Sequence, residues 1–332
     1  MYSGISNMAP ETESFYKNCT QCPRNCKIDR FSQYVGFCRE PADLRIAFAG
    51  LHFGEEPLVT VKGGSGTIFF TGCTLRCKFC QNYQISQEGL GRPVNKEEFV
   101  KICQKLQDAG AENINLVTGS HHIPVIAEYL KAARTAGITI PFCWNSSAYE
   151  KVEMLELLKG LVTIWLPDFK TLDRQLSKQL FDAEDYPEVC SKAIKWMIEN
   201  NPLNIEESDN DDTPDKMLQG VIIRHLFLPG KFAETADVLQ WLKENADGRA
   251  CISLMNQYTP IPAKEGKIKE FEDRLVTKQE DEDIQDLIAA YDFDYLFYQE
   301  LSDDTSWLPD FNRPQPFSNK LAKPLWHCKH NL

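Results

Sequence analysis

The sequence lacks long apolar runs and any excess of basic residues. No stretch approaches the roughly 18 apolar residues that cross a bilayer, and residues 1–14 are polar, without the apolar core of a signal peptide. The formal net charge of −12 argues against broad electrostatic binding to nucleic acid or to anionic membranes. We therefore expect neither a nucleic-acid nor a membrane partner, and we expect a cytoplasmic location.

Cysteine, in contrast, is abundant, with 12 residues in a chain of 332. In a reducing compartment thiols rarely form disulfides, so such a number indicates metal ligands. Most of the cysteines fall into two compact groups, one within residues 19–38 and the other within residues 73–80. These two groups are the main functional signal of the sequence.

The second group has the spacing C-x3-C-x2-C, formed by Cys73, Cys77 and Cys80 directly after the apolar run 67–71. Three thiolates on one tight loop hold three irons of a four-iron cluster and leave the fourth iron open to a small molecule. Ferredoxin-type loops instead supply four thiolates and close the cluster. A zinc knuckle or three buried free thiols are the alternatives, although a zinc site normally has four ligands.

The first group consists of four cysteines near the N-terminus, with Pro23 and Gly36 as turn formers between them. Its members are Cys19, Cys22, Cys26 and Cys38. Four thiols within twenty residues can enclose a metal. The spacing does not decide between zinc and a second iron–sulfur cluster.

The loop resembles a known signature. Cys73, Cys77, Phe79 and Cys80 match the C-x3-C-x-aromatic-C motif of radical S-adenosylmethionine (SAM) enzymes. The flanking segments 64–70 and 80–86 resemble those of the pyruvate-formate-lyase-activating-enzyme-like, or PflX-like, subgroup, and the resemblance extends over about residues 19–300. Related proteins carry a similar Cys-Pro-x-x-Cys and Gly-Phe-Cys pattern near the N-terminus.

This resemblance implies a partial (β/α)6 barrel and a [4Fe-4S] cluster whose open iron is chelated by the amino and carboxylate groups of SAM. It implies that Cys73, Cys77 and Cys80 serve catalysis by holding that cluster. Reductive cleavage of SAM would give a 5′-deoxyadenosyl radical that abstracts hydrogen from the substrate. The first candidate substrate is a backbone glycine of a partner glycyl-radical enzyme, with flavodoxin or ferredoxin as electron donor. The alternatives are radical modification of another peptide or small metabolite, and a non-catalytic iron–sulfur protein.

The rest of the chain alternates between strand-like and helix-like segments, which predicts an α/β fold with a parallel sheet. Strands are predicted at 67–72, 113–119, 138–144, 162–168, 219–228, 250–255 and 294–299. We expect an extension with the four-cysteine module at 1–60, the barrel at 61–300 and an irregular tail at 301–332. The acidic run 206–215 predicts a solvated insertion over about 204–216, since it lacks the glycine and closing glutamate of a calcium loop.

Polar residues lie at or near the carboxyl ends of these strands, where ligands bind in parallel α/β folds. The candidates for cofactor contact are Thr118, Ser120, Asn145, Ser146, Asp168, Lys170, Arg224 and His225. Isolated charges within a buried strand are costly unless they are paired. We therefore expect either Arg224 or His225 to point into the barrel.

The resemblance gives some of these residues a role. Radical SAM enzymes often carry Gly-Gly-Glu after the second strand, but this chain has Thr118-Gly119-Ser120 there, so the SAM amino group needs another partner. Asn145 and Ser146 occupy the place of a polar pair that approaches the SAM carboxylate or ribose. Asp168-x-Lys170 resembles the Asp-x-Lys motif of glycyl-radical-enzyme activases, in which lysine neutralises the carboxylate and aspartate orients an ammonium or binds a cation. The alternative is a surface ion pair, which contributes little.

Other polar clusters have simpler interpretations. We expect His52, Glu55 and Glu56 to cap the barrel with local hydrogen bonds, and His121-His122 to begin a helix without a chemical role. The tract 327–330, His-Cys-Lys-His, is treated as incidental.

Overall fold

The computed structural model describes residues 3–210, 212–302, 305 and 307–330. Its strands are β1 (Arg45–His52), β2 (Ser65–Phe70), β3 (Arg92–Pro93), β4 (Ile114–Val117), β5 (Phe142–Ser146), β6 (Ile164–Pro167), β7 (Asn204–Glu206), β8 (Lys216–Leu226), β9 (Cys251–Met255), β10 (Leu296–Tyr298) and β11 (Ala322–His327).

The strands form one sheet in the order β10-β9-β8-β6-β5-β4-β2-β1-β11, with β3 paired to β1 and β7 paired to β8. Parallel pairings join β2, β4, β5, β6, β8, β9 and β10 in succession. The sheet is not closed, because its order begins at β10 and ends at β11. The predicted α/β fold with a mostly parallel, partial barrel is therefore confirmed.

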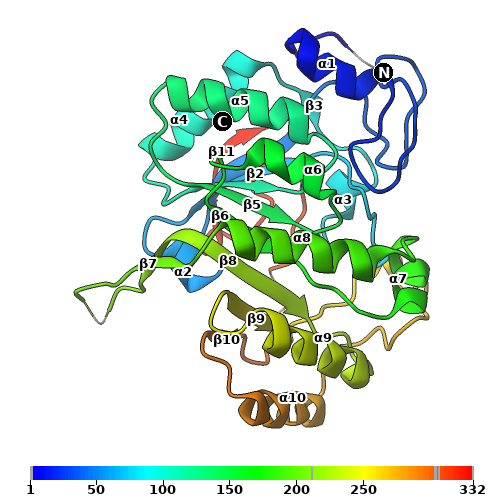
Figure 1. Ribbon diagram of the computed structural model, residues 1–332, viewed down its shortest axis with the longest axis vertical. Helices are drawn as coiled ribbons and strands as arrows, with labels where there is room; N and C mark the ends of the chain where they lie inside the picture. The colour runs from blue at the N-terminus through cyan, green and yellow to red at the C-terminus, as the bar shows by residue number, and fades with distance from the viewer. Residues whose placement is uncertain (1–2, 211, 303–304, 306, 331–332) are drawn as a thin grey trace.

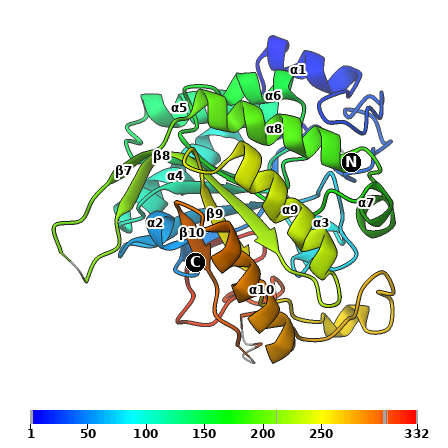
Figure 2. The same cartoon turned by 60° about the horizontal axis from the view of Figure 1, so that its bottom comes forward.

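The helices of the described residues are α1 (Pro10–Lys17), α2 (Pro57–Thr60), α3 (Tyr83–Ser86), α4 (Lys96–Asp108), α5 (Ile123–Thr135), α6 (Val152–Leu155), α7 (Arg174–Phe181), α8 (Tyr186–Asn200), α9 (Phe232–Asn245) and α10 (Lys278–Tyr291), with short 3-10 turns at Glu156–Leu158 and Pro262–Lys264. The longer helices α4, α5, α8, α9 and α10 connect the parallel strands and cover one face of the sheet (Figures 1 and 2). In contrast, α1 precedes β1, and α2 joins the antiparallel strands β1 and β2.

Local sequence explains why the longer helices form. In α4, Phe99, Ile102 and Leu106 recur on one face and are buried, while the Asn95 side chain caps the first turn by accepting from the Glu98 amide. Thr277 and Glu280 form a reciprocal capping box at the start of α10. Both helices thus have a side-chain start signal, and α4 also has an apolar face to bury.

The two faces of the sheet differ because successive strand residues point to opposite sides. Trp144, Trp165 and Ile223 belong to the main core beneath the helices. Two smaller apolar clusters use other positions of the same strands: one gathers Phe48 and Phe69 with the C-terminal segment, and the other runs along β5, β6 and β8. Asn145 follows Trp144 and Arg224 follows Ile223 in the chain. Their side chains therefore point to the face of the sheet opposite the main core.

The prediction of an irregular tail at 301–332 was wrong for one segment. Residues Ala322–His327 form β11, which pairs antiparallel with β1. Pro324 lacks an amide hydrogen, but an edge strand tolerates it opposite the irregularity at Ala49/Gly50. The predicted extension at 1–60 is likewise not separate from the sheet, since β1 within it pairs with β2.

The acidic run forms the loop of a hairpin between β7 and β8, which projects from one side of the molecule (Figure 1). Its described residues are mostly exposed, as predicted, whereas Asp211 lies outside the described residues. None of the described helices is long and apolar enough to cross a membrane.

Candidate functional site

The three-cysteine loop follows the carboxyl end of β2, as predicted. Cys73 and Cys77 are buried and Cys80 is half-buried. The backbone amides of Leu75 and Arg76 lie 3.3 and 3.5 Å from Cys73 Sγ, and Arg76 has a left-handed φ of 53°. Burial raises the pKa of both Cys77 and Cys80. Without metal these thiols keep their protons, so binding iron at this loop must release them.

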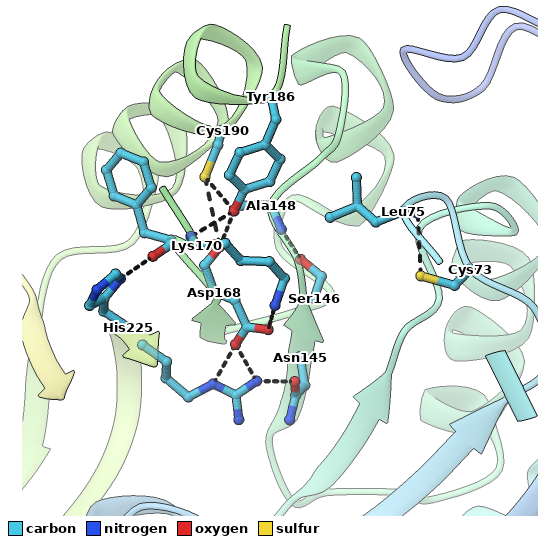
Figure 3. A network of polar contacts seen from close by, with 12 residues as sticks. Cys73, Leu75, Asn145, Ser146, Ala148, Asp168, Lys170, Tyr186, Cys190 and His225 are labelled. Atoms are coloured by element: carbon cyan, nitrogen blue, oxygen red, sulfur yellow. Dashed lines mark hydrogen bonds and ion pairs between the residues drawn. The ribbon is translucent and has the colours of Figure 1, made fainter. Parts of the chain in front are cut away.

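A network of charged side chains from β6 and β8 lies beside the loop (Figure 3). Asp168 accepts from Lys170 Nζ at 2.8 Å through Oδ2 and from Arg224 Nε at 2.9 Å through Oδ1. The Lys170 ammonium lies 6.0 Å from the ring centroid of Phe79 in the loop. The network therefore borders the cysteine loop, and Figure 3 shows the thiol of Cys73 pointing toward it.

The charges of this network stabilise one another. Burial alone would disfavour the Asp168 carboxylate, yet Arg224 and Lys170 together lower the pKa of Asp168 below its usual value. Burial also works against the charged form of Lys170, but Asp168 raises the pKa of Lys170. All three groups are consequently ionised at neutral pH.

The backbone of the Asp168–Lys170 segment is anchored from α8. The Tyr186 hydroxyl donates to the Asp168 carbonyl at 2.8 Å and accepts from the Lys170 amide at 3.0 Å. The Phe169 amide bonds to the Arg224 carbonyl at 2.7 Å. These contacts fix the directions of both charged side chains, since a strand end would otherwise be free to turn.

Glu55 extends the network in a way the sequence did not predict. Its carboxylate lies 3.3 Å from Arg224 Nη1 and accepts from Asn145 Nδ2 at 3.4 Å. The expectation of purely local hydrogen bonds was therefore wrong for Glu55, whose partners lie 90 and 169 residues away. Burial raises the pKa of Glu56 to about 6 and raises that of Glu55, although Arg224 opposes both shifts.

Asn145 joins this network, whereas Ser120 and Ser146 join another. Asn145 Oδ1 accepts from Arg224 Nη2 at 2.5 Å. The hydroxyls of Ser120 and Ser146 both donate to Glu150, at 2.6 and 3.0 Å. Burial raises the pKa of Glu150. The two serines therefore hold a buried carboxyl group that the sequence did not single out.

His225 does not join the candidates around the loop. Its Nδ1 lies 2.6 Å from the Phe169 carbonyl and its Nε2 lies 2.9 Å from Thr235 Oγ1 in α9. Because Arg224 and His225 are successive strand residues, they face opposite sides of the sheet, and only Arg224 points into the barrel. Burial lowers the pKa of His225 to about 4, so its ring is neutral.

Thr118 ends β4 with a left-handed φ of 62°, and its amide donates to the Asn145 carbonyl at 2.8 Å. A β-branched residue rarely adopts this conformation, which is strained. The strain lies at the edge of the sheet where the loop and Asn145 meet. A SAM contact by Thr118 stays a prediction.

The C-terminal segment reaches the helix that follows the loop. Gln84 in α3 donates to Asp310 Oδ1 at 2.8 Å and accepts from the Phe311 amide at 2.6 Å. Phe311 and Phe317 stack against Phe69 of β2, with ring centroids 5.2 and 5.7 Å away. This segment therefore covers the inner face of β2 beside the cysteine loop.

Cys19, Cys22 and Cys38 are buried and Cys26 is half-buried. All four line one small cavity. As they stand, no three or more Cys, His, Asp or Glu side chains of the described residues form an arrangement that could hold a metal ion, at this module or elsewhere.

Two comparisons place the chain in a family. The profile of the radical SAM superfamily matches residues 67–202. The uncharacterized protein MJ0674 of Methanocaldococcus jannaschii is 32% identical over 295 residues, which cover 86% of this chain and 78% of that protein. The chain belongs to the radical SAM superfamily. This membership implies a [4Fe-4S] cluster and SAM as cofactors of an enzyme.

Two solved structures are similar to parts of this chain, both with TM-scores below 0.5. SuiB from Streptococcus suis bound to S-adenosylmethionine is 14% identical with a TM-score of 0.48, and the match covers 69% of this chain and 48% of SuiB. A domain of a pyruvate-formate lyase-activating enzyme from Bacteroides vulgatus is 13% identical with a TM-score of 0.38, covering 54% of this chain and 92% of that domain. The radical SAM chain thus spans about half the length of SuiB.

The residues of this radical SAM protein fit those cofactors. Cys73, Cys77 and Cys80 offer three thiolates on one loop, so a four-iron cluster bound there keeps one iron without a protein ligand. Lys170 and Asp168 offer opposite charges beside the loop, and the methionine part of SAM carries both a carboxylate and an ammonium. The donor set and its charges therefore agree with the family.

Proposed function

We propose that this protein cleaves SAM reductively at a [4Fe-4S] cluster held by Cys73, Cys77 and Cys80. When bound, the cluster and SAM supply an electron and a 5′-deoxyadenosyl radical, so the chain itself needs no radical-forming side chain. The observation that carries the proposal is the Lys170–Asp168–Arg224 network beside the loop, 2.8 Å apart at its closest contacts.

Each member of the network has a separate task. Lys170 provides the positive charge for the SAM carboxylate, and Asp168 provides the negative charge for its ammonium. Arg224 and Tyr186 position these two groups, because Arg224 bonds the Asp168 carboxylate and Tyr186 bonds the backbone on either side of Phe169. The C-terminal segment, with Phe311 and Phe317 on β2, helps to keep water from the inner face.

For the substrate, we propose a backbone glycine of a partner enzyme, which would become a glycyl radical. The Asp168-x-Lys170 pattern supports this choice, since it resembles the motif of glycyl-radical-enzyme activases. Radical modification of another peptide or of a small metabolite is the alternative, because fold and cofactor do not determine the substrate.

The first test is anaerobic reconstitution with iron and sulfide, followed by SAM and dithionite. We expect 5′-deoxyadenosine and methionine in equal amounts. Their absence, despite a bound cluster, would refute the cleavage reaction. The second test adds a candidate glycyl-radical enzyme and records electron paramagnetic resonance spectra. Cleavage without a glycyl radical on any such partner would favour the alternative substrates.

A further inference from the structure

The four N-terminal cysteines line one small, partly open cavity. Cys19, Cys22, Cys26 and Cys38 line a cavity of about 10 Å³, which is about the size of a single water site. Gly36 permits this closure, because a Cβ at its position would lie 2.9 Å from Cys26 Sγ. The Phe37 amide lies 3.5 Å from the same sulfur. The backbone is therefore folded tightly around the thiols.

Two buried polar atoms beside this cavity have no partner. His121 and Gln21 both line it and are 1% and 2% exposed. His121 Nε2 bonds to the Thr71 carbonyl at 2.7 Å, which leaves Nδ1 as the nitrogen with a free lone pair. His121 Nδ1 and Gln21 Oε1 find no hydrogen-bond partner among the described residues. Buried polar atoms are rarely left unsatisfied. Both of these atoms are acceptors, so they favour an occupant that carries a cation or donates a hydrogen bond, such as a metal ion.

The charges around the cavity point to a negative occupant. Arg30 and Arg24 both line it, and Arg30 is 1% exposed. Arg30 donates to the carbonyls of Pro41 at 2.7 Å and His121 at 2.5 Å, and Arg24 donates to the carbonyl of Thr74 at 2.9 Å. Neither guanidinium forms an ion pair with a carboxylate of the described residues. The nearest carboxylate to act on Arg30 is that of Glu40, which forms its own ion pair with Arg45. A buried cation without a directly bonded counter-charge is disfavoured.

We propose that Cys19, Cys22, Cys26 and Cys38 hold a second metal centre as thiolates, and that Arg24 and Arg30 balance its charge. Four thiolates on a dicationic metal core leave about two negative charges, which two arginines neutralise. Because the thiols do not form a single-ion site as they stand, their side chains turn inward when metal binds. The shared requirement is a thiophilic core, either zinc or an iron–sulfur cluster.

This centre lies directly behind the SAM-cluster loop. Arg24 bonds the carbonyl of Thr74, and His121 bonds the carbonyl of Thr71, on the two sides of Cys73. A Cβ on Gly72 would meet the carbonyl oxygen of Cys38 at 2.9 Å. Closing the module around metal therefore fixes the backbone that carries Cys73.

The test separates the two cysteine groups. The full chain with Cys73→Ala, Cys77→Ala and Cys80→Ala is purified without oxygen and treated with a chelator, and its zinc, iron and acid-labile sulfide are counted. We expect one centre per chain, seen as about one zinc without sulfide or as about four irons with matching sulfide. Metal below about a tenth of one centre per chain would overturn the proposal.

Adding Cys26→Ser to the triple variant should lower its metal content per chain at least about fivefold. Adding Cys328→Ser to the triple variant should leave the metal content unchanged. Cys328 is the matched control because both cysteines are half-buried. Equal metal in the two variants overturns the proposal. If the triple variant does not fold, wild type is compared with Cys26→Ser alone, which should lose one centre while the loop cluster and SAM cleavage remain measurable. An unchanged metal count there also overturns the proposal, independently of SAM cleavage.

Discussion

The two cysteine groups differ in how the charges around them are balanced. Beside the loop, the cations already have protein partners, since Asp168 bonds both Lys170 and Arg224. Around the N-terminal module, Arg24 and Arg30 bond only neutral acceptors of the described residues. A site with paired charges can receive a ligand that brings charges of both signs, as SAM does. A site with unpaired cations requires an anionic occupant, which four metal-bound thiolates supply.

The largest effect should come from removing one thiol of each group. Cys77→Ala should reduce 5′-deoxyadenosine formation to the level measured without protein, because a cluster with two protein ligands is not held for SAM. Cys22→Ala should lower metal content and stability yet retain part of the cleavage, if the two centres have separate roles. The measurements are anaerobic product analysis and the spectroscopic signal of the SAM-bound cluster. Equal loss of that signal in both variants would contradict the separation, and Cys328→Ser is the control.

The next effect concerns the paired charges of the barrel. Asp168→Asn leaves Lys170 and Arg224 without their shared carboxylate and should lower the free energy of unfolding by about 2 kcal/mol. This value is below that of a fully buried pair, because the Asp168 side chain is 25% exposed. SAM affinity should fall at least about tenfold, which calorimetry on the reconstituted protein measures.

Glu188→Gln is the matched control for Asp168→Asn. Glu188 also pairs with an arginine, Arg174, but the two side chains are 48% and 58% exposed. An exposed pair contributes about 0.5 kcal/mol or less, and SAM affinity should not change. If both variants behaved alike, the Asp168 network would be an ordinary surface pair and not part of the SAM site.

Much of this arrangement was accessible from the sequence, and the exceptions have physical reasons. Apolar periodicity predicted the parallel strands, because local burial patterns determine them. The pairing of β11 with β1 was not predicted, since an edge strand that contains Pro324 has a weak local signal and a distant partner. Glu55 was misjudged for a related reason, because its partner Arg224 is 169 residues away. Strand alternation, in contrast, already required Arg224 and His225 to face opposite sides.

The pH dependence of stability should isolate one ring of the barrel, His225, when wild type is compared with a His225 variant. His121 beside the module also has a pKa lowered by burial, but it contributes equally to both proteins. The folded protein holds His225 neutral with a pKa lowered to about 4 by burial, against about 6.5 in an unfolded chain. Stability from the neutral ring is complete above about pH 6.5 and is lost as pH falls toward 4. Linkage predicts a loss of about 2 kcal/mol between pH 7 and pH 5 that His225→Gln lacks.

Urea unfolding of both proteins at the two pH values measures this loss. The difference in stability between wild type and Glu56→Gln should change with pH in the opposite direction, because burial raises the pKa of Glu56 to about 6. Its carboxylate therefore destabilises the folded protein increasingly as pH rises from about 4.5 to about 6, and the effect levels off above that pH. The loss should be about 1 kcal/mol between pH 5 and pH 7. A wild-type-to-His225→Gln difference that does not change with pH would show that the ring is not buried neutral.

The smallest effect should be a change in the midpoint potential of the cluster bound at the three-cysteine loop. Ser86 Oγ lies 3.2 Å from Cys80 Sγ, and Ser86 is buried. A hydrogen bond to a ligand sulfur stabilises the reduced cluster, which carries more negative charge, so Ser86→Ala should lower its midpoint potential by an amount on the order of tens of mV. Ser86→Thr keeps the hydroxyl and should restore the potential. Redox titration followed by electron paramagnetic resonance measures both. Ser86 belongs to α3 and not to the N-terminal module, so Ser86→Ala should not change the metal content of the module. A loss of metal from the module in this variant would mean that the two cysteine groups form a single cooperative centre.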